Sequence, residues 1–289
     1  MDNITIVFCE GQHDIAFLSK ILYVHGYKEY KKKLKVFKEP FGKQYLSILR
    51  EKYKIKDENN TDNEDSRIKN ISDDKIGFNP IYQIPSVALY KEDELVLFHN
   101  MGGDGRVVER KNLLEMYQNI QGEDDFSSFG LNFKFLYFFD ADTNIVQDRI
   151  DELNKELILS ENIEHNTVLN ADSYYWSCYV FHKGAIGGYL EDVLLDLMKP
   201  DNEEIFENTE AFISSNILTP IERQSEYKPF NDVYNNKCKF KDKKSIISVA
   251  GQLQFSGMAN AVIIAKSDFI KKDDILHSDV CNDIMKMFQ

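Results

Sequence analysis

The amino-acid sequence predicts an α/β fold with a Rossmann-type central parallel sheet, flanking helices and a helical C-terminal portion. Runs of strand length that are rich in β-branched and aromatic residues lie at 4–9, 133–139 and 174–181. Segments of helical periodicity lie at 12–25 and 145–159, directly after the first two of these runs. Because strands that alternate with helices usually join through right-handed crossovers, this order favours a parallel sheet.

The remaining segments extend the same pattern. Further β-like runs and helical segments are expected at 84–90, 95–99, 106–120, 187–198, 203–215, 242–256 and the C-terminal end. A polar, acidic stretch at about 54–80 interrupts the order, and its composition is typical of an insertion outside the core.

The composition is that of a globular, acidic chain. Its 289 residues are 43% hydrophobic, which is enough for a full core, and the net charge is -13. No window approaches about 18 uninterrupted apolar residues, and the N-terminus lacks a basic n-region, so we expect a cytoplasmic protein without membrane spans. The cysteines form no CxxC pair, which favours reduced thiols over a zinc knuckle or disulfide framework. They are Cys9, Cys178, Cys238 and Cys281.

Lysine is concentrated in two places despite the negative net charge. In 28–38 lysines alternate with aromatic residues, and a second cluster lies near the C-terminus. A basic groove with stacking rings would follow a nucleic-acid backbone, whereas a solvated face or a lysine-protected edge strand has the same composition, and both interpretations stay open. The second cluster consists of Lys237, Lys239, Lys241, Lys243 and Lys244.

Carboxylates follow two of the expected strands. Glu10 and Asp14 come just after the run at 4–9, and Asp140-Ala141-Asp142 follows the run at 133–139. The carboxyl ends of parallel strands meet at one sheet edge, where ligands bind in open α/β folds. Carboxylates gathered there repel one another unless a hard divalent cation neutralises them. The sequence therefore predicts a metal site at this edge.

The order of these motifs resembles the Toprim metal-binding domain, and in particular the nuclease half of OLD-family proteins and related small bacterial proteins. Glu10-Gly11 after one strand and Asp140-Ala141-Asp142 after a later one carry the resemblance. Gly102-Gly103, the segment 188–192 and Lys243-Lys244 strengthen it. The separation between the two acidic motifs exceeds that of a minimal Toprim core, so insertions are expected, one of them at 54–80.

The resemblance implies a Toprim-like core at 1–200 and a helical extension at 201–289 that completes the site. The implied activity is metal-dependent phosphodiester hydrolysis of nucleic acid, with Lys243 or Lys244 neutralising transition-state charge and Gly102-Gly103 allowing close approach of phosphate. One or two Mg²⁺ or Mn²⁺ ions would be bound by Glu10, Asp14, Asp140, Asp142, Glu191 and Asp192.

Partners follow from the same resemblance. The chain has no GxxxxGK[ST] phosphate loop, so the ATPase that OLD proteins carry would be a separate subunit. DNA is expected as substrate rather than RNA, in phage defence or DNA repair, and a homo-oligomer is left open.

Other interpretations compete with this one. A glycosyltransferase would use Asp140-Ala141-Asp142 to bind a metal and a sugar diphosphate, but it leaves Glu10-Gly11 unexplained. A haloacid-dehalogenase-type phosphatase would have threonine where Asn144 stands. A non-catalytic Toprim-like scaffold remains open, because acids in a first helical turn also favour the helix dipole and His13 has the pattern of a polar surface residue.

Overall fold

The computed structural model describes residues 2–52, 81–122, 130–216 and 242–289. In this part of the chain one seven-stranded sheet has the strand order β2-β3-β4-β1-β5-β7-β6. The four central strands are parallel: β4 (Glu94–Asn100), β1 (Asn3–Cys9), β5 (Asn132–Asp140) and β7 (Tyr174–Phe181). The three outer strands run antiparallel to their neighbours: β2 (Lys28–Glu29) and β6 (Leu169–Ala171) at the two edges, and β3 (Val87–Lys91) between β2 and β4.

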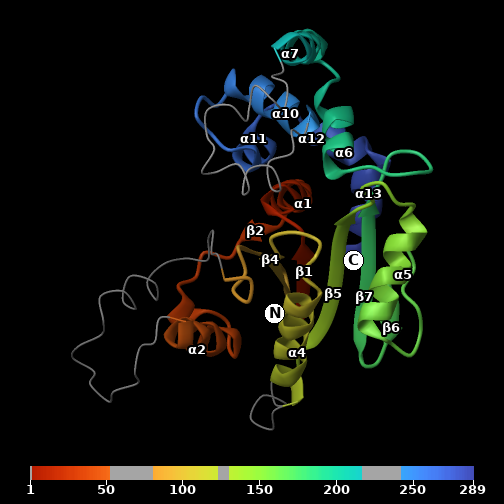
Figure 1. The fold of residues 1–289 in the computed structure, drawn as a ribbon. Helices are drawn as coiled ribbons and strands as arrows, with labels where there is room; N and C mark the ends of the chain where they lie inside the picture. The colour runs from red at the N-terminus through yellow and green to blue at the C-terminus, as the bar shows by residue number, and fades with distance from the viewer. Residues whose placement is uncertain (1, 53–80, 123–129, 217–241) are drawn as a thin grey trace, which may run out of the picture.

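Helices cover both faces of the sheet (Figure 1). One face carries α2 (Phe41–Lys52), α4 (Val107–Gly122) and α5 (Val146–Leu157), with the short 3-10 turn η1 (Leu34–Val36) beside α2. The other face carries α1 (Gln12–Val24) and the helices of the C-terminal portion. These are α6 (Leu190–Met198), α7 (Glu203–Asn216), α10 (Asp242–Gln252), α11 (Asn260–Lys266), α12 (Lys272–His277) and α13 (Asp279–Phe288).

Side-chain alternation along the central strands divides the core in two. In β1, Ile6 and Phe8 face α2, α4 and α5, whereas Val7 and Cys9 face α1. Successive residues of a strand point to opposite faces, so a continuous apolar run is what a sheet covered on both sides requires. Aromatic stacking joins neighbouring strands, since the rings of Phe8 and Tyr137 lie 4.4 Å apart.

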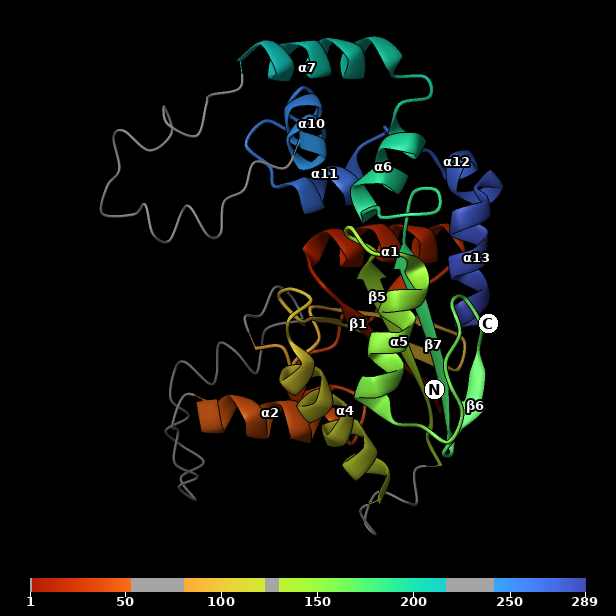
Figure 2. The same ribbon diagram turned by 45° about the vertical axis from the view of Figure 1, so that its right-hand side comes forward.

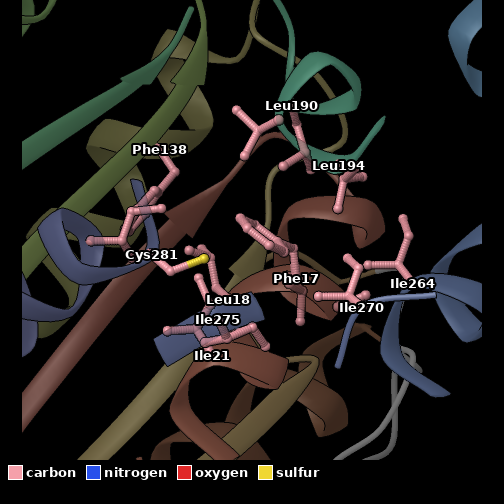
Figure 3. Packing of buried hydrophobic residues seen from close by; sticks show 14 of the residues in the cluster. Phe17, Leu18, Ile21, Phe138, Leu190, Leu194, Ile264, Ile270, Ile275 and Cys281 are labelled. Atoms are coloured by element: carbon pink, nitrogen blue, oxygen red, sulfur yellow. The ribbon is translucent and has the colours of Figure 1, made fainter. Parts of the chain in front are cut away.

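Helix α1 is enclosed between the sheet and the C-terminal helices (Figure 2). Its apolar face contributes Phe17, Leu18 and Ile21, all fully buried. Figure 3 shows these side chains meeting others from α6, α11 and α12, such as Leu194 and Ile275. The C-terminal portion therefore completes the hydrophobic core over the first crossover helix.

The fold class predicted from the sequence is confirmed: an α/β architecture with a parallel centre, flanking helices and a helical C-terminus. The order of the strands at the edges was not anticipated. β3 and β4 form an antiparallel hairpin whose turn contains Glu92 at φ 50°. The run expected at 84–90 is a strand only from Val87, where its pairing with β4 begins. α11 was also missed, as was the division of the C-terminal end into α12 and α13. With seven and six residues, α11 and α12 are too short to show a clear helical period.

Several predicted features lie outside the described residues, among them the polar stretch 54–80, Cys238 and the lysines 237, 239 and 241. Lys28 belongs to the exposed edge strand β2, which fits the edge-protection interpretation of the first lysine cluster. The described cysteines, Cys9, Cys178 and Cys281, are buried free thiols. None of the helices in the described ranges has both the length and the apolar character needed to cross a membrane.

Candidate functional site

The two acidic motifs meet at the carboxyl edge of the parallel strands. Glu10 directly follows β1, and Asp140 is the last residue of β5, its neighbour in the sheet. The backbone N–H of Asp140 donates a 2.9 Å hydrogen bond to Oε1 of Glu10. Oδ1 of Asp140 in turn accepts a 2.7 Å hydrogen bond from the backbone N–H of Leu190, the first residue of α6. Three segments far apart in sequence are thus joined at one point.

Asp14 is the third carboxylate of this group. It lies in the first turn of α1, is 7% exposed, and accepts a 2.6 Å hydrogen bond from the backbone N–H of Gly11. Burial raises the pKa of Asp14 to about 7, and the charges of Glu10 and Glu191 act in the same direction.

The pKa values of Asp140 and Glu10 are raised as well. Burial, followed by the charges of Asp14 and Glu10, raises the pKa of Asp140 to about 8. Burial also raises the pKa of Glu10, against the lowering effect of its hydrogen bond from the Asp140 backbone. None of these three carboxylates forms an ion pair with a residue in the described part of the chain. The three carboxylates are therefore crowded, and their burial and mutual repulsion disfavour the fully ionised state of the group.

Glu191 and Asp192, in the first turn of α6, are buried but paired. Oε1 of Glu191 lies 3.0 Å from Nδ1 of His13 and 3.3 Å from Nζ of Lys244. Burial by itself would raise the pKa of Glu191, but the hydrogen bond to His13 and the charge of Lys244 outweigh it and lower the pKa. Asp192 accepts a 3.1 Å hydrogen bond from the backbone N–H of Tyr189 and lies 2.6 Å from Nζ of Lys243.

Arg149 of α5 contacts the loops that follow β4 and β5 at the same edge of the sheet. Its guanidinium donates 2.7 Å hydrogen bonds to Oδ2 of Asp104 and Oδ2 of Asp142. It also donates a 2.9 Å bond to Glu152 and a 3.1 Å bond to the backbone carbonyl of Asp140. Because a planar guanidinium presents several donors at fixed angles, one side chain fixes the loops after β4 and β5 together.

Glycines shape the loops around these acids. Gly188 forms a reciprocal pair of 3.0 Å backbone hydrogen bonds with Asp142. Its φ is +132°, and a Cβ there would lie 2.3 Å from the backbone nitrogen of Lys183, so only glycine fits this bridge. At Gly102 and Gly103 the space is open, but their N–H groups already donate to Oδ1 of Asn100 and to the carbonyl of Glu10. Since these N–H groups are already engaged, the two glycines could only let a phosphate come close to the backbone.

The residues predicted from the sequence as metal ligands fall into two sets. Glu10, Asp14 and Asp140 come together without ion pairs, whereas Asp142, Glu191 and Asp192 are engaged by Arg149, Lys244 and Lys243. In the described ranges no group of three or more His, Cys, Asp or Glu side chains has its donor atoms gathered as for a bound metal ion. The physical reason is that backbone N–H groups, lysines and an arginine satisfy these oxygens separately.

The donor chemistry nevertheless fits a hard cation. The unpaired set offers only carboxylate oxygens, the ligands that Mg²⁺ and Mn²⁺ prefer. The raised pKa values of Asp14 and Asp140 express repulsion and burial that a bound cation would relieve. Binding would require side-chain rotation of Glu10 or Asp140 away from a backbone N–H.

Three residues at this edge were missed or misjudged from sequence. Arg149 was not singled out, although it adjoins the buried face of α5 formed by Ile150 and Leu153, where an arginine needs partners. Asp104 was not singled out either, and no sequence signal connects it with Arg149. His13 was interpreted as a polar surface residue and instead contacts Glu191.

Comparisons with known proteins were made for the whole chain. No protein-family model matches it, and no curated protein does. Among solved structures, it is similar to the crystal structure of a hypothetical protein from Pyrococcus horikoshii OT3, with 12% sequence identity, a TM-score of 0.46 and 100% of each chain covered.

Proposed function

We propose that this protein is a metal-dependent, Toprim-like nuclease or nuclease subunit that hydrolyses phosphodiester bonds of nucleic acid. The observation that carries the proposal is the group formed by Glu10, Asp14 and Asp140, three carboxylates without ion pairs in the described structure. Crowded carboxylates at the carboxyl edge of a parallel sheet suit a divalent cation, which would stabilise their ionised form.

Glu10, Asp14 and Asp140 would hold Mg²⁺ or Mn²⁺. A divalent ion bound there supplies Lewis-acid stabilisation of phosphate oxygens and lowers the pKa of water. A scaffold role alone gives no reason to keep carboxylates crowded, because uncompensated charge destabilises the folded state.

The surrounding charges favour a phosphate-bearing substrate. Lys243 and Lys244 extend from α10 to the rim of the carboxylate group, where Lys243 also lies 5.2 Å from the centre of the Tyr189 ring. Their side chains are 41% and 37% exposed, so they neutralise Asp192 and Glu191 while remaining accessible. Accessible ammonium groups beside a cation site orient a phosphodiester and stabilise developing negative charge.

Both acidic motifs belong to the same arrangement, which supports the Toprim-like interpretation over a glycosyltransferase that uses only Asp140-Ala141-Asp142. Glu10 is in direct hydrogen-bond contact with the backbone of Asp140. Asp142 is instead paired with Arg149 and is 42% exposed, so it would join the site only after exchanging that partner.

Cleavage assays test the proposal. Wild-type protein is incubated with supercoiled plasmid, single-stranded DNA and RNA in Mg²⁺ or Mn²⁺, beside Glu10→Gln and Asp140→Asn. The controls are Glu161→Gln and Asp151→Asn, which make the same chemical changes at exposed positions. We expect cleavage by the wild type and both controls and its loss in the two site variants. Equal cleavage by folded Glu10→Gln would contradict the proposal.

Calorimetric titration with Mn²⁺ separates the remaining outcomes. Metal binding without cleavage would indicate that the chain requires a partner such as an ATPase subunit. Absence of both binding and cleavage would leave a Toprim-like scaffold as the better interpretation.

A further inference from the structure

A second feature lies beside the carboxylate group: a cavity of about 400 Å³ between α4 and α5. The two helices run next to each other over the same face of the sheet (Figure 2). The volume falls within the range of roughly 300–1,000 Å³ that is usual for small-molecule pockets. Its lining includes Val107, Arg110 and Lys111 of α4, Phe139 of β5, and Leu153 and Lys155 of α5.

The cavity has an apolar part and a fixed polar wall. Phe139 and Leu153 are almost completely buried beneath it, and Val107 is 41% exposed at its edge. Arg110 lies 5.1 Å from the centre of the Phe139 ring and binds Glu156 with two hydrogen bonds of 3.0 and 2.6 Å. The Phe139 ring thus supports the guanidinium from below, and a planar guanidinium beside an exposed apolar edge suits a flat ring that has polar edges.

Two lysines add positive charge to this pocket. Neither Lys111 nor Lys155 forms an ion pair within the ranges that the structure describes, whereas Arg110 and Arg149 are both paired with carboxylates. Ammonium groups without acidic partners beside an apolar surface favour a ligand that carries its own negative charge.

The pocket shares Arg149 with the candidate site. Asp104 and Arg149 line the pocket, and the same Arg149 contacts Asp142 and the backbone carbonyl of Asp140. Arg149 therefore connects the pocket with the segment that carries Asp140 and Asp142.

We infer that the pocket between α4 and α5 binds a nucleotide, with the base at the exposed edge formed by Val107, beside the Arg110 guanidinium, and the phosphate at Lys111 and Lys155. This inference rests on the proposed function, for which it supplies a substrate-positioning subsite. The same chemistry is offered by a free mononucleotide and by one nucleotide of a strand. An apolar edge beside a planar guanidinium accepts any base, so the subsite positions the strand without selecting a sequence.

Calorimetric titration with 5′-AMP in EDTA tests the pocket without metal. Adenosine and inorganic phosphate serve as half-probes, and both should bind more weakly than AMP. Two variants alter the pocket: the double variant Lys111→Ala with Lys155→Ala removes the charge, and Val107→Trp fills the exposed edge. Lys266→Ala removes an exposed lysine on α11, far along the chain, and is the control.

We expect AMP to bind about tenfold or more weakly to each pocket variant, since one removes the charge that holds the phosphate and the other fills the space for the base, and normally to Lys266→Ala. Absence of AMP binding by the wild type, or unchanged affinity in either pocket variant, would overturn the inference. Thermal unfolding shows whether each variant is folded. Competition with a short single-stranded oligodeoxynucleotide then distinguishes the sources: displacement of AMP indicates a nucleotide of a strand, and no displacement indicates a free nucleotide.

The two proposals fail separately. If Glu10→Gln binds AMP normally in EDTA while wild-type protein neither binds metal nor cleaves nucleic acid, the pocket stands and the proposed function falls. If the wild type cleaves nucleic acid with metal but binds no AMP, the nuclease proposal stands and the pocket inference falls.

Discussion

Replacing Asp140 by Asn should stabilise the folded protein at pH 8 in the absence of metal. The side-chain oxygen of Asn can still accept the hydrogen bond from the Leu190 N–H, while the negative charge beside Asp14 and Glu10 is removed. The variant therefore isolates the electrostatic cost of the ionised carboxylate from its structural contact.

The magnitude follows from the pKa. The interval between the ordinary value of 3.8 and about 8 for Asp140 corresponds to about 6 kcal/mol once the group is fully ionised, at about 1.4 kcal/mol per pH unit. This figure is an upper limit, because Asp14 and Glu10 share the same repulsion and relax when Asp140 is neutral. We expect a gain of about 2–4 kcal/mol at pH 8.

The direction of the pH dependence is fixed by linkage. Because the pKa of Asp140 is raised in the folded state, its stabilising contribution is fully present below about pH 4 and is lost as the pH rises through about 8. Wild-type stability in EDTA should thus fall across this interval, with Asp14, whose pKa is about 7, adding to the loss. In Asp140→Asn the fall should be much smaller.

Urea unfolding in EDTA at pH 5 and pH 8 measures the effect. Asp151→Asn, at an exposed position of α5, is the matched control and should change stability little at either pH. Adding Mg²⁺ at pH 8 should stabilise the wild type more than Asp140→Asn. A variant that is no more stable than the wild type at pH 8 would refute the reasoning that these carboxylates are crowded.

Three further substitutions test the scaffold around the site by urea unfolding. Arg149→Leu removes the guanidinium that joins two loops and should cost about 2–3 kcal/mol, with partial exposure of its acidic partners reducing the loss; a cost near zero would contradict this role. Glu156→Gln leaves Arg110 buried without its counter-charge and should cost about 3–5 kcal/mol, much more than the double change of both residues to Met. Gly188→Ala should cost more than about 2 kcal/mol, because its Cβ would meet backbone, whereas Gly26→Ala, with φ +91° and open space, should cost about 1 kcal/mol; equal losses would contradict the steric argument.

The parallel centre of the sheet could be predicted because strands that are buried on both faces are continuous apolar runs in the sequence. The strand 133–139, as expected, lies within β5 (Asn132–Asp140), and 174–181 coincides with β7. The edge strands could not be predicted in this way, because β2 has two residues and β6 three, which is too few to show a periodic pattern. Their direction depends on which neighbour has an open edge, which is a property of the assembled sheet.

The sequence also allowed us to predict which carboxylates lie at the carboxyl edge of the sheet. It did not allow us to predict which basic side chains form ion pairs with them. Residues such as Glu10 and Asp140 follow strands that run parallel, and parallel strands end on the same side of a sheet. That Lys244 reaches Glu191, and Arg149 reaches Asp104, depends on how helices separated by many residues pack against that edge.

By itself, the sequence determined the alternation of strands and helices and the presence of carboxylates at two strand ends, because both are local patterns along the chain. The tertiary structure alone decided which carboxylates are neutralised by Arg149 or the α10 lysines and which remain crowded. It also decided that α4 and α5 border an open pocket that shares Arg149 with the site. Burial and charge pairing depend on distances in space, which no spacing of residues along the chain specifies.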